Sequence, residues 1–197
     1  DPDGRQQQSR DAKQRHQPGI EPALQQNQPQ SLIEGADAED WERRVDPSDG
    51  SALADNPFYT TPGATRSKVW ALGLRNPFHF AMKPGTSILY VNDVGWGSFE
   101  EVNVATRGAN FGWPCHEGPF PQGGYQGAFP GTCAGSTPAA PLVAYDHGQG
   151  SAICGAAFVS SMAFPAEYRG NFFFADYTGH WIRRAIVDED DVLQGVA

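Results

Sequence analysis

The chain has 197 residues, enough for one ordinary domain, and it carries a formal net charge of −9 at pH 7. This acidic balance argues against nucleic acid as a partner, because the sequence has no basic stripe to release counterions from phosphates. No apolar run approaches the roughly 18 residues that a membrane span needs, and no basic-then-apolar signal segment opens the chain.

Composition divides the chain at about residue 45. The first 30 residues hold nine Gln and no aromatic residue, so they cannot bury enough apolar surface to offset the entropy of ordering. Residues 31–44 could add one or two helical turns. We therefore expect 1–44 to be a disordered or unrelated leader and 45–197 to be the folded part. Because the chain opens at Asp1 without Met, we also expect a fragment or a processed piece.

The folded part predicts short strands joined by tight turns, since it is rich in Gly, Pro and aromatic residues. The predicted strands lie between Gly, Pro or Asp corners at 67–75, 78–84, 87–93, 99–105, 151–160, 170–177 and 180–188. The first of them stops before an Asn-Pro pair, and 78–93 predicts a hairpin or an adjacent strand pair. No amphipathic helix interrupts the series, so we expect an all-β sandwich, barrel or propeller.

Three cysteines fall in the folded part. Cys115 and Cys133 bracket a Gly/Pro-rich loop, and a disulfide closing it would stabilise the fold by roughly 3 kcal/mol on the chain-entropy model. Such a bond would indicate an oxidising compartment, whereas the alternative is two free thiols. Cys154 lies in an apolar run and is expected to be a small buried residue.

Two long motifs stand out in the folded part. The first is "VWALGLRNPFHFAM…LYVNDVGWGSFEEVNVATRGANFGWP", and the second is "YDHGQGSAICGAAF…FPAEYRGNFFFADYTGHWIRR". Both resemble the soluble glucose/sorbosone dehydrogenases, which are quinoprotein sugar dehydrogenases built as six-bladed β-propellers, with a subgroup of hedgehog-interacting-protein-like chains. The likeness runs from about Val45 to Val187. It implies an all-β fold, a partial six-bladed β-propeller of about three blades from the C-terminal part of a larger protein.

The resemblance also implies a chemistry. The family oxidises the CH–OH group of a sugar or polyol with pyrroloquinoline quinone (PQQ) as hydride acceptor, holds Ca²⁺ beside it, and passes electrons to an external acceptor. A secreted, periplasmic or extracellular location would follow. The alternative is a non-catalytic propeller of the hedgehog-interacting type that binds a protein or a glycan. The long loop between Cys115 and Cys133 favours that alternative, while the retained "RN" and "DVG" elements favour the enzyme.

Four positions carry the cofactor roles that the resemblance implies. Arg75 and Asn76 match the pair that contacts the quinone, a planar tricarboxylate suited to a guanidinium fork. Gly95 and Trp96 fall where the family holds calcium with two successive backbone carbonyls. Trp96 replaces a proline of the best-known bacterial enzymes, and its indole could line the substrate cleft instead. The alternatives are an Arg75–carboxylate pair between blades, an Asn-Pro turn, and a β-turn with a half-exposed Trp.

A second, structural calcium is implied at Glu101, with Phe111 adding its backbone carbonyl. Because neighbouring residues of a strand face opposite ways, only one of Glu100 and Glu101 can serve a given site. The alternative is a solvated acidic pair. Asp93 is expected to cap a turn rather than to bind a metal.

The family's general base is a histidine that has no counterpart in this chain, so the catalytic residue is unknown. His147 lies in a segment that the family shares and is a candidate to line the cofactor site. Packing or surface roles are expected for His79, His116 and His180. A family lysine is replaced near Tyr177 and Thr178, and further quinone-binding arginines would fall beyond Ala197. We therefore expect this chain to be inactive alone, because positioned acid–base groups usually contribute about 100- to 10,000-fold.

Overall fold

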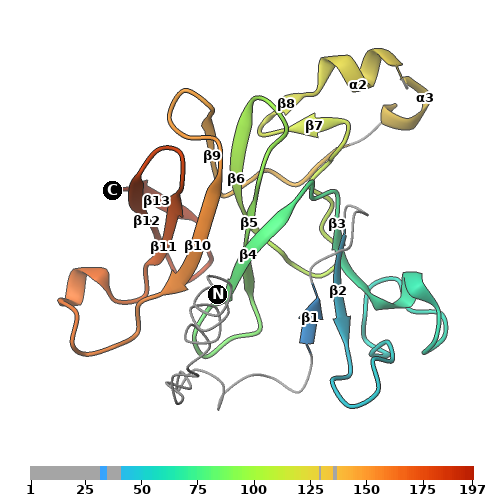
Figure 1. The fold of residues 1–197 in the computed structure, drawn as a ribbon. Helices are drawn as coiled ribbons and strands as arrows, with labels where there is room; N and C mark the ends of the chain where they lie inside the picture. Colours follow the sequence, from blue (N-terminus) through green and yellow to red (C-terminus); the bar gives the residue numbers. More distant parts are fainter. Residues whose placement is uncertain (1–31, 35–40, 129, 135–136) are drawn as a thin grey trace, which may run out of the picture.

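A computed structural model describes residues 32–34, 41–128, 130–134 and 137–197 (Figure 1). These residues form antiparallel sheets with a few short helices. The first sheet has three strands, and two further sheets have four strands each. None of the helices in the described ranges is long and apolar enough to cross a membrane.

The sheets follow one another along the chain (Figure 1). The first is ordered β1 (Leu32–Glu34), β2 (Trp41–Val45) and β3 (Val69–Leu72). The middle sheet is ordered β4 (Pro77–Met82), β5 (Leu89–Asp93), β6 (Phe99–Val104) and β9 (Val143–Asp146). The last is ordered β10 (Ile153–Phe158), β11 (Phe172–Asp176), β12 (Trp181–Val187) and β13 (Leu193–Val196).

The middle sheet is covered on both faces, which explains why every residue of β5 is buried. Side chains of a strand alternate between the two faces. Leu89 and Val91 pack in one core with Ala71 and Leu74 of the first sheet and its turn. Tyr90 packs in the other core with aromatic and aliphatic residues of the last sheet, among them Ile153, Phe172 and Phe174. The apolar run of β5 therefore joins two cores.

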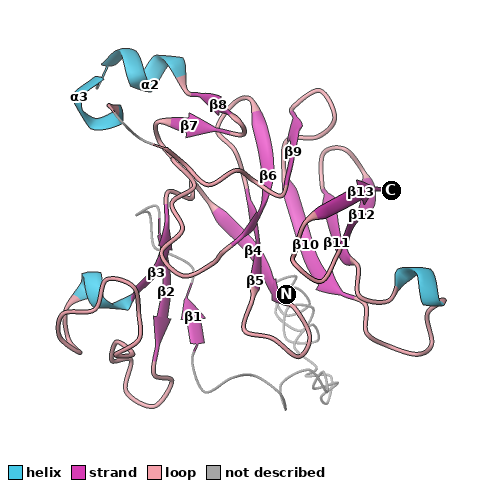
Figure 2. Cartoon of the chain, turned by 180° about the vertical axis from the view of Figure 1, so that it is seen from behind, coloured by secondary structure: helices cyan, strands magenta, loops and turns pink. Residues whose placement is uncertain are grey.

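A long excursion separates β6 from β9. It contains the two-stranded ribbon β7 (His116–Glu117) and β8 (Phe120–Pro121), then the short helices α2 (Gly123–Ala128) and α3 (Pro130–Cys133). Figure 2 shows this excursion at the same end of the molecule as the β5–β6 turn. Single-turn 3₁₀ helices occupy Thr65–Lys68 and Ala166–Tyr168.

The seven strands predicted from the sequence are confirmed, with tighter bounds, and the predicted pair over 78–93 is the β4–β5 hairpin. One other expectation is wrong, because residues 32–34 and 41–45 form strands rather than helical turns. The boundary expected at residue 45 stays a prediction. The short helices α2 and α3 lie in the excursion, and none of the side chains of α2 is buried, so α2 has no apolar stripe that a sequence pattern could reveal. Residues 1–31 and 35–40 lie outside the described residues.

The predicted disulfide joins Cys115 to Cys133, with 5.4 Å between the Cα atoms. Cys154 is a free cysteine, but it is half-buried rather than buried. Burial raises the pKa of its thiol, because an apolar surrounding disfavours the thiolate.

Candidate functional site

The candidate site begins where the turn between β3 and β4 meets the end of β5. The buried carboxylate of Asp93 accepts hydrogen bonds from the backbone amides of Arg75, at 2.9 and 3.1 Å, and of Asn76, at 2.6 Å. Asp93 is therefore the turn cap that the sequence predicted. Burial, followed by the charge of Glu101, raises the pKa of Asp93 to about 8.

The two predicted cofactor corners converge. Nη1 of Arg75 donates to the carbonyl of Val94 at 3.0 Å and to that of Gly95 at 2.6 Å. Its guanidinium carbon lies 5.7 Å from the ring centre of Trp113, within cation–π range. Among the ion pairs of the described residues, none includes Arg75, so the alternative pairing with a carboxylate is not observed.

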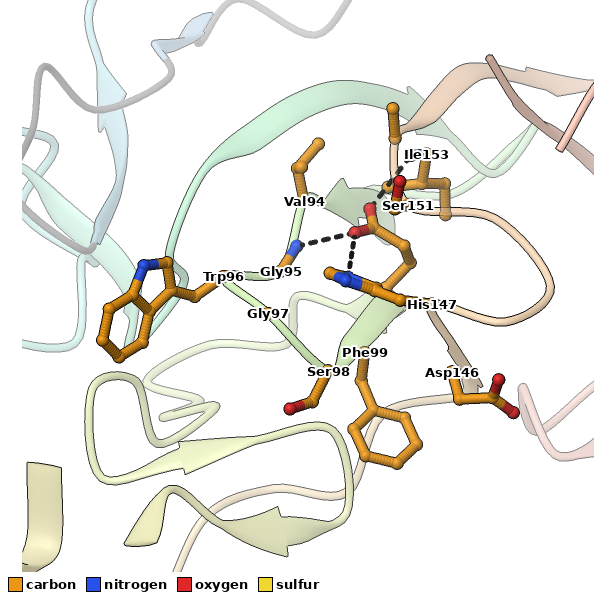
Figure 3. Close-up of polar contacts among 12 residues, drawn as sticks. Val94, Gly95, Trp96, Gly97, Ser98, Phe99, Asp146, His147, Ser151 and Ile153 are labelled. Carbon is orange, nitrogen blue, oxygen red and sulfur yellow. Dashed lines mark hydrogen bonds and ion pairs between the residues drawn. The ribbon is translucent and has the colours of Figure 1, made fainter. Parts of the chain in front are cut away.

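A buried carboxylate connects Gly95 to the last sheet. Glu100 Oε1 accepts from the amide of Gly95 at 3.2 Å and pairs with Nε2 of His147 at 2.9 Å, while Oε2 accepts from the amide of Ile153 at 2.9 Å. Figure 3 shows Gly95, His147 and Ile153 around this carboxylate. Burial raises the pKa of Glu100 despite these hydrogen bonds. His147 thus contacts the carboxylate that binds the Gly95 amide, and its role in lining a cofactor site stays a prediction.

The loop 95–98 is held by a residue that sequence reasoning missed. Glu117 Oε1 accepts from four consecutive amides, those of Trp96, Gly97 and Ser98 at 2.8 Å and of Phe99 at 3.2 Å. Burial opposes ionisation of Glu117, but the amide hydrogen bonds outweigh it and lower its pKa. The contact spans about twenty residues of an irregular segment, so no local pattern could have revealed it.

Glu101 faces the opposite way from Glu100, as the strand geometry predicted. Its two oxygens accept from the amide of Gly118 and, at 2.8 Å, from Nδ2 of Asn103. Burial raises the pKa of Glu101. Phe111 packs in the core between the first and middle sheets, and its amide donates to the carbonyl of Leu72 at 2.9 Å. Glu100 and Glu101 are both buried, so the alternative of a solvated acidic pair is not observed.

The donor chemistry at Gly95 and Trp96 suits a hard cation, because peptide carbonyl oxygens are calcium ligands. A C=O lies antiparallel to the N–H of the same trans peptide unit. Since the amides of Trp96 and Gly97 point at Glu117, the carbonyls of Gly95 and Trp96 point away from it. Side-chain ligands do not gather in the same way, since the described residues contain no group of three or more His, Cys, Asp or Glu arranged to hold a metal.

The remaining predicted residues lie around this loop or away from it. Asn76 is exposed at its corner. The side chain of Trp96 is 59% exposed, and its ring meets that of Trp113 edge-on at 6.0 Å between centroids. Tyr177 is exposed, and the hydroxyl of Thr178 donates to Asp176.

The three other described histidines lie outside these contacts. His79 and His180 are exposed, and His116 is half-buried, which agrees with the packing and surface roles expected for them.

Comparisons with known proteins agree on one family. The family model described as Glucose / Sorbosone dehydrogenase matches residues 43–196. The HIPL2 protein of Arabidopsis thaliana is 31% identical over 144 residues, which is 70% of this chain and 20% of that protein. Aldose sugar dehydrogenase YliI of Escherichia coli K12 is 40% identical over 65 residues, 33% of this chain and 17% of that protein.

Solved structures show the same relationship. The soluble aldose sugar dehydrogenase of Escherichia coli, in its apo form, matches with a TM-score of 0.61 at 26% identity, over 79% of this chain and 44% of that chain. The PQQ-bound aldose sugar dehydrogenase of Streptomyces coelicolor gives 0.61 at 22% identity, over 85% and 45%. The chain thus spans about a fifth of these curated relatives and less than half of these solved structures. It belongs to the glucose/sorbosone dehydrogenase family.

Proposed function

We propose that this chain contributes part of the cofactor site of a quinoprotein oxidoreductase that oxidises the CH–OH group of a sugar or polyol. The observation that supports this most is the 2.6 Å contact between the Arg75 guanidinium and the Gly95 carbonyl. It brings the planar Arg75 guanidinium next to the carbonyls of Gly95 and Trp96 and the exposed indole of Trp96.

Within this proposal, the two four-stranded sheets are blades of a propeller and β1–β3 belong to a third. Arg75 and Asn76 would bind and orient PQQ, because hydrogen bonds to the described residues engage only one guanidinium nitrogen of Arg75. Gly95 and Trp96 would hold Ca²⁺ through their carbonyls, and His147 would line the site. Trp96 offers an apolar face to a sugar ring.

Glu101 and Phe111 are proposed to hold a second cation. A buried carboxyl whose pKa is raised gains from a nearby divalent charge, which favours its ionised form. When bound, the quinone would accept hydride, and calcium would polarise its reacting carbonyl. Glu100 and Glu117 would meanwhile keep the loop in place, and the general base would come from outside this chain.

The disulfide is consistent with an oxidising compartment, so we propose a secreted or periplasmic location. In the proposed reaction, the electrons taken from the sugar would pass to an external acceptor.

A titration of the chain with PQQ in the presence of Ca²⁺ tests the proposed site. We expect Arg75→Ala to weaken quinone binding by about 2 kcal/mol, roughly 30-fold, the size of a lost charge-assisted hydrogen bond. Arg169→Ala is the matched control, since Arg169 is engaged with the carbonyl of Phe164 in the last sheet's connection. Equal affinity of parent and Arg75→Ala would remove Arg75 from the site.

A second candidate function is a non-catalytic module that binds a protein or glycan. It is favoured by the coverage of the HIPL2 likeness, 70% of this chain, and by the disulfide-closed excursion beside the site. The same titration separates the two, because a binding module of this kind would take up no quinone at all, with either the parent or the variants.

A further inference from the structure

We propose that Glu117 is a positioning residue that fixes loop 95–99 so that the carbonyls of Gly95 and Trp96 face the cofactor site. The part that concerns a bound cation depends on the proposed function, whereas the part that concerns the conformation of the loop does not. No family motif in the sequence pointed to this residue.

A single carboxylate oxygen accepts the hydrogen bonds of four consecutive amides in the loop. Oε1 of Glu117 accepts from the amides of residues 96–99 at 2.8 to 3.2 Å, and the side chain is only 7% exposed. Four donors converging on one anion form a backbone nest of the kind that binds carboxylates and phosphates. Here the anion is part of the protein, so the nest is filled from within.

Convergence of the amides dictates where the carbonyls go. In each trans peptide unit the C=O lies opposite the N–H, so four amides aimed at Glu117 turn the carbonyls of residues 95–98 away from it. The contacts of these carbonyls agree, because the carbonyl of Gly95 accepts from Arg75 and the carbonyl of Ser98 accepts from the amide of His147 at 3.0 Å. Rotation of the peptide unit between Gly95 and Trp96, or of that between Ser98 and Phe99, would lose both an amide contact and a carbonyl contact.

Other contacts hold only the two ends of the loop. Glu100 binds the amide of Gly95, Arg75 binds the carbonyl of Gly95, and the amide of His147 binds the carbonyl of Ser98. Gly97 and Ser98 are exposed, and two glycines in five residues raise the entropy lost on ordering. Glu117 is therefore the group that binds the amides along the middle of the segment that connects β5 to β6.

Glu117 is itself braced by the disulfide-closed excursion. It lies on β7, opposite Phe120 on β8, and the ring of Phe120 meets that of Phe99 at 5.4 Å. Cys115, two residues earlier, is bonded to Cys133. The excursion thus supports loop 95–99. In the sequence, its length had favoured a partner-binding role.

Hydrogen exchange read by mass spectrometry tests the conformational part. In Glu117→Ala we expect the amides of residues 96–99 to exchange at least tenfold faster, while those of β11 and β12 stay unchanged. Glu117→Gln keeps one acceptor oxygen and should restore part of the protection, which a general loss of folding would not do. Glu167→Ala, at an exposed glutamate, should match the parent.

Terbium luminescence, excited through tryptophan, tests the cation part. We expect Glu117→Ala to weaken terbium binding in the presence of PQQ by at least tenfold, with Glu117→Gln in between. Unchanged exchange at 96–99 in both Glu117 variants would overturn the proposal. Faster exchange with unchanged terbium affinity would overturn the cation part. Faster exchange at 96–99 in Glu117→Ala, together with a parent that binds no terbium, would support the positioning role of Glu117 and contradict the proposed function.

Discussion

Several single carboxyl residues are buried in or beside the first and middle sheets, among them Glu42, Asp93 and Glu101. Glu42 of β2 is fully buried, and neither of its oxygens has a hydrogen-bond partner among the described residues. Burial, then the charge of Asp93, raises its pKa to about 8. Such a group costs stability once it is ionised, because no partner replaces its hydration.

Glu42 should therefore make folding depend on pH in an unusual direction. The folded chain keeps the Glu42 proton up to about pH 8, while the unfolded chain releases it near the ordinary value of 4.5. The folded state binds more protons in that window, so stability is full below about 4.5 and falls as the pH rises toward 8.

We expect Glu42→Gln, which cannot ionise, to match the parent near pH 4 and to exceed it near pH 8 by a few kcal/mol at most. Urea unfolding at both pH values measures this difference. Asp93 and Glu101 remain in both proteins, so their titration largely cancels in the comparison. A constant difference between pH 4 and pH 8 would show that Glu42 is not held neutral.

The two glycines of loop 95–99 offer a second residue-scale prediction. A Cβ on Gly95 would come within 1.6 Å of the carbonyl oxygen of Phe99, whereas a Cβ on Gly97 would meet nothing within 4 Å. Gly95→Ala should therefore destabilise the chain by about 2 kcal/mol or more and displace the loop, while Gly97→Ala should be near neutral. Thermal unfolding of both variants measures the contrast, and equal melting temperatures would contradict the geometry.

Sequence reasoning succeeded for elements with apolar runs between clear corners and failed for elements held by distant contacts. The apolar strands β3, β5, β6, β11 and β12 were predicted. The ribbon β7–β8 and the strand β13 lack such runs and are placed by pairing with their neighbours. β9 was not predicted; it follows the Pro/Gly-rich loop and forms by pairing with β6.

The same distinction holds for the site. A motif marks the corners at Arg75 and Gly95, whose cofactor role stays a prediction, and the turn-capping role of Asp93 followed from its place at a corner. The contact of Glu117 with residues 96–99 is nonlocal and irregular, and the burial of Glu101 depends on the excursion that covers it. Such contacts follow from the three-dimensional arrangement and leave no periodic trace in the sequence.

The excursion between β6 and β9 gives a prediction at the scale of structural elements. Replacing Cys115 and Cys133 by Ser should cost about 3 kcal/mol, because the unfolded chain regains the entropy of a loop with a sequence separation of 18. Cys154→Ser, at the free cysteine, should cost much less. Denaturant unfolding compares the two proteins, and a double variant as stable as the parent would mean that the excursion is held by its other contacts alone.

At the scale of the whole molecule, the arrangement consists of successive antiparallel sheets with cores on both faces of the middle one (Figures 1 and 2). This arrangement brings the β3–β4 turn and the β5–β6 loop to one end of the middle sheet, where Arg75 and Gly95 meet. The cofactor role that we propose belongs to this end of the sheet.

The most direct measurement is nuclear magnetic resonance of the chain labelled with carbon-13 and nitrogen-15, titrated with PQQ and Ca²⁺ together. If this end of the middle sheet grips a metal-bound quinone, the carbonyl signals of Gly95 and Trp96 and the guanidinium signals of Arg75 should shift in one saturable step. Saturable shifts confined to other regions, with these three residues unmoved, would contradict the assignment of the site.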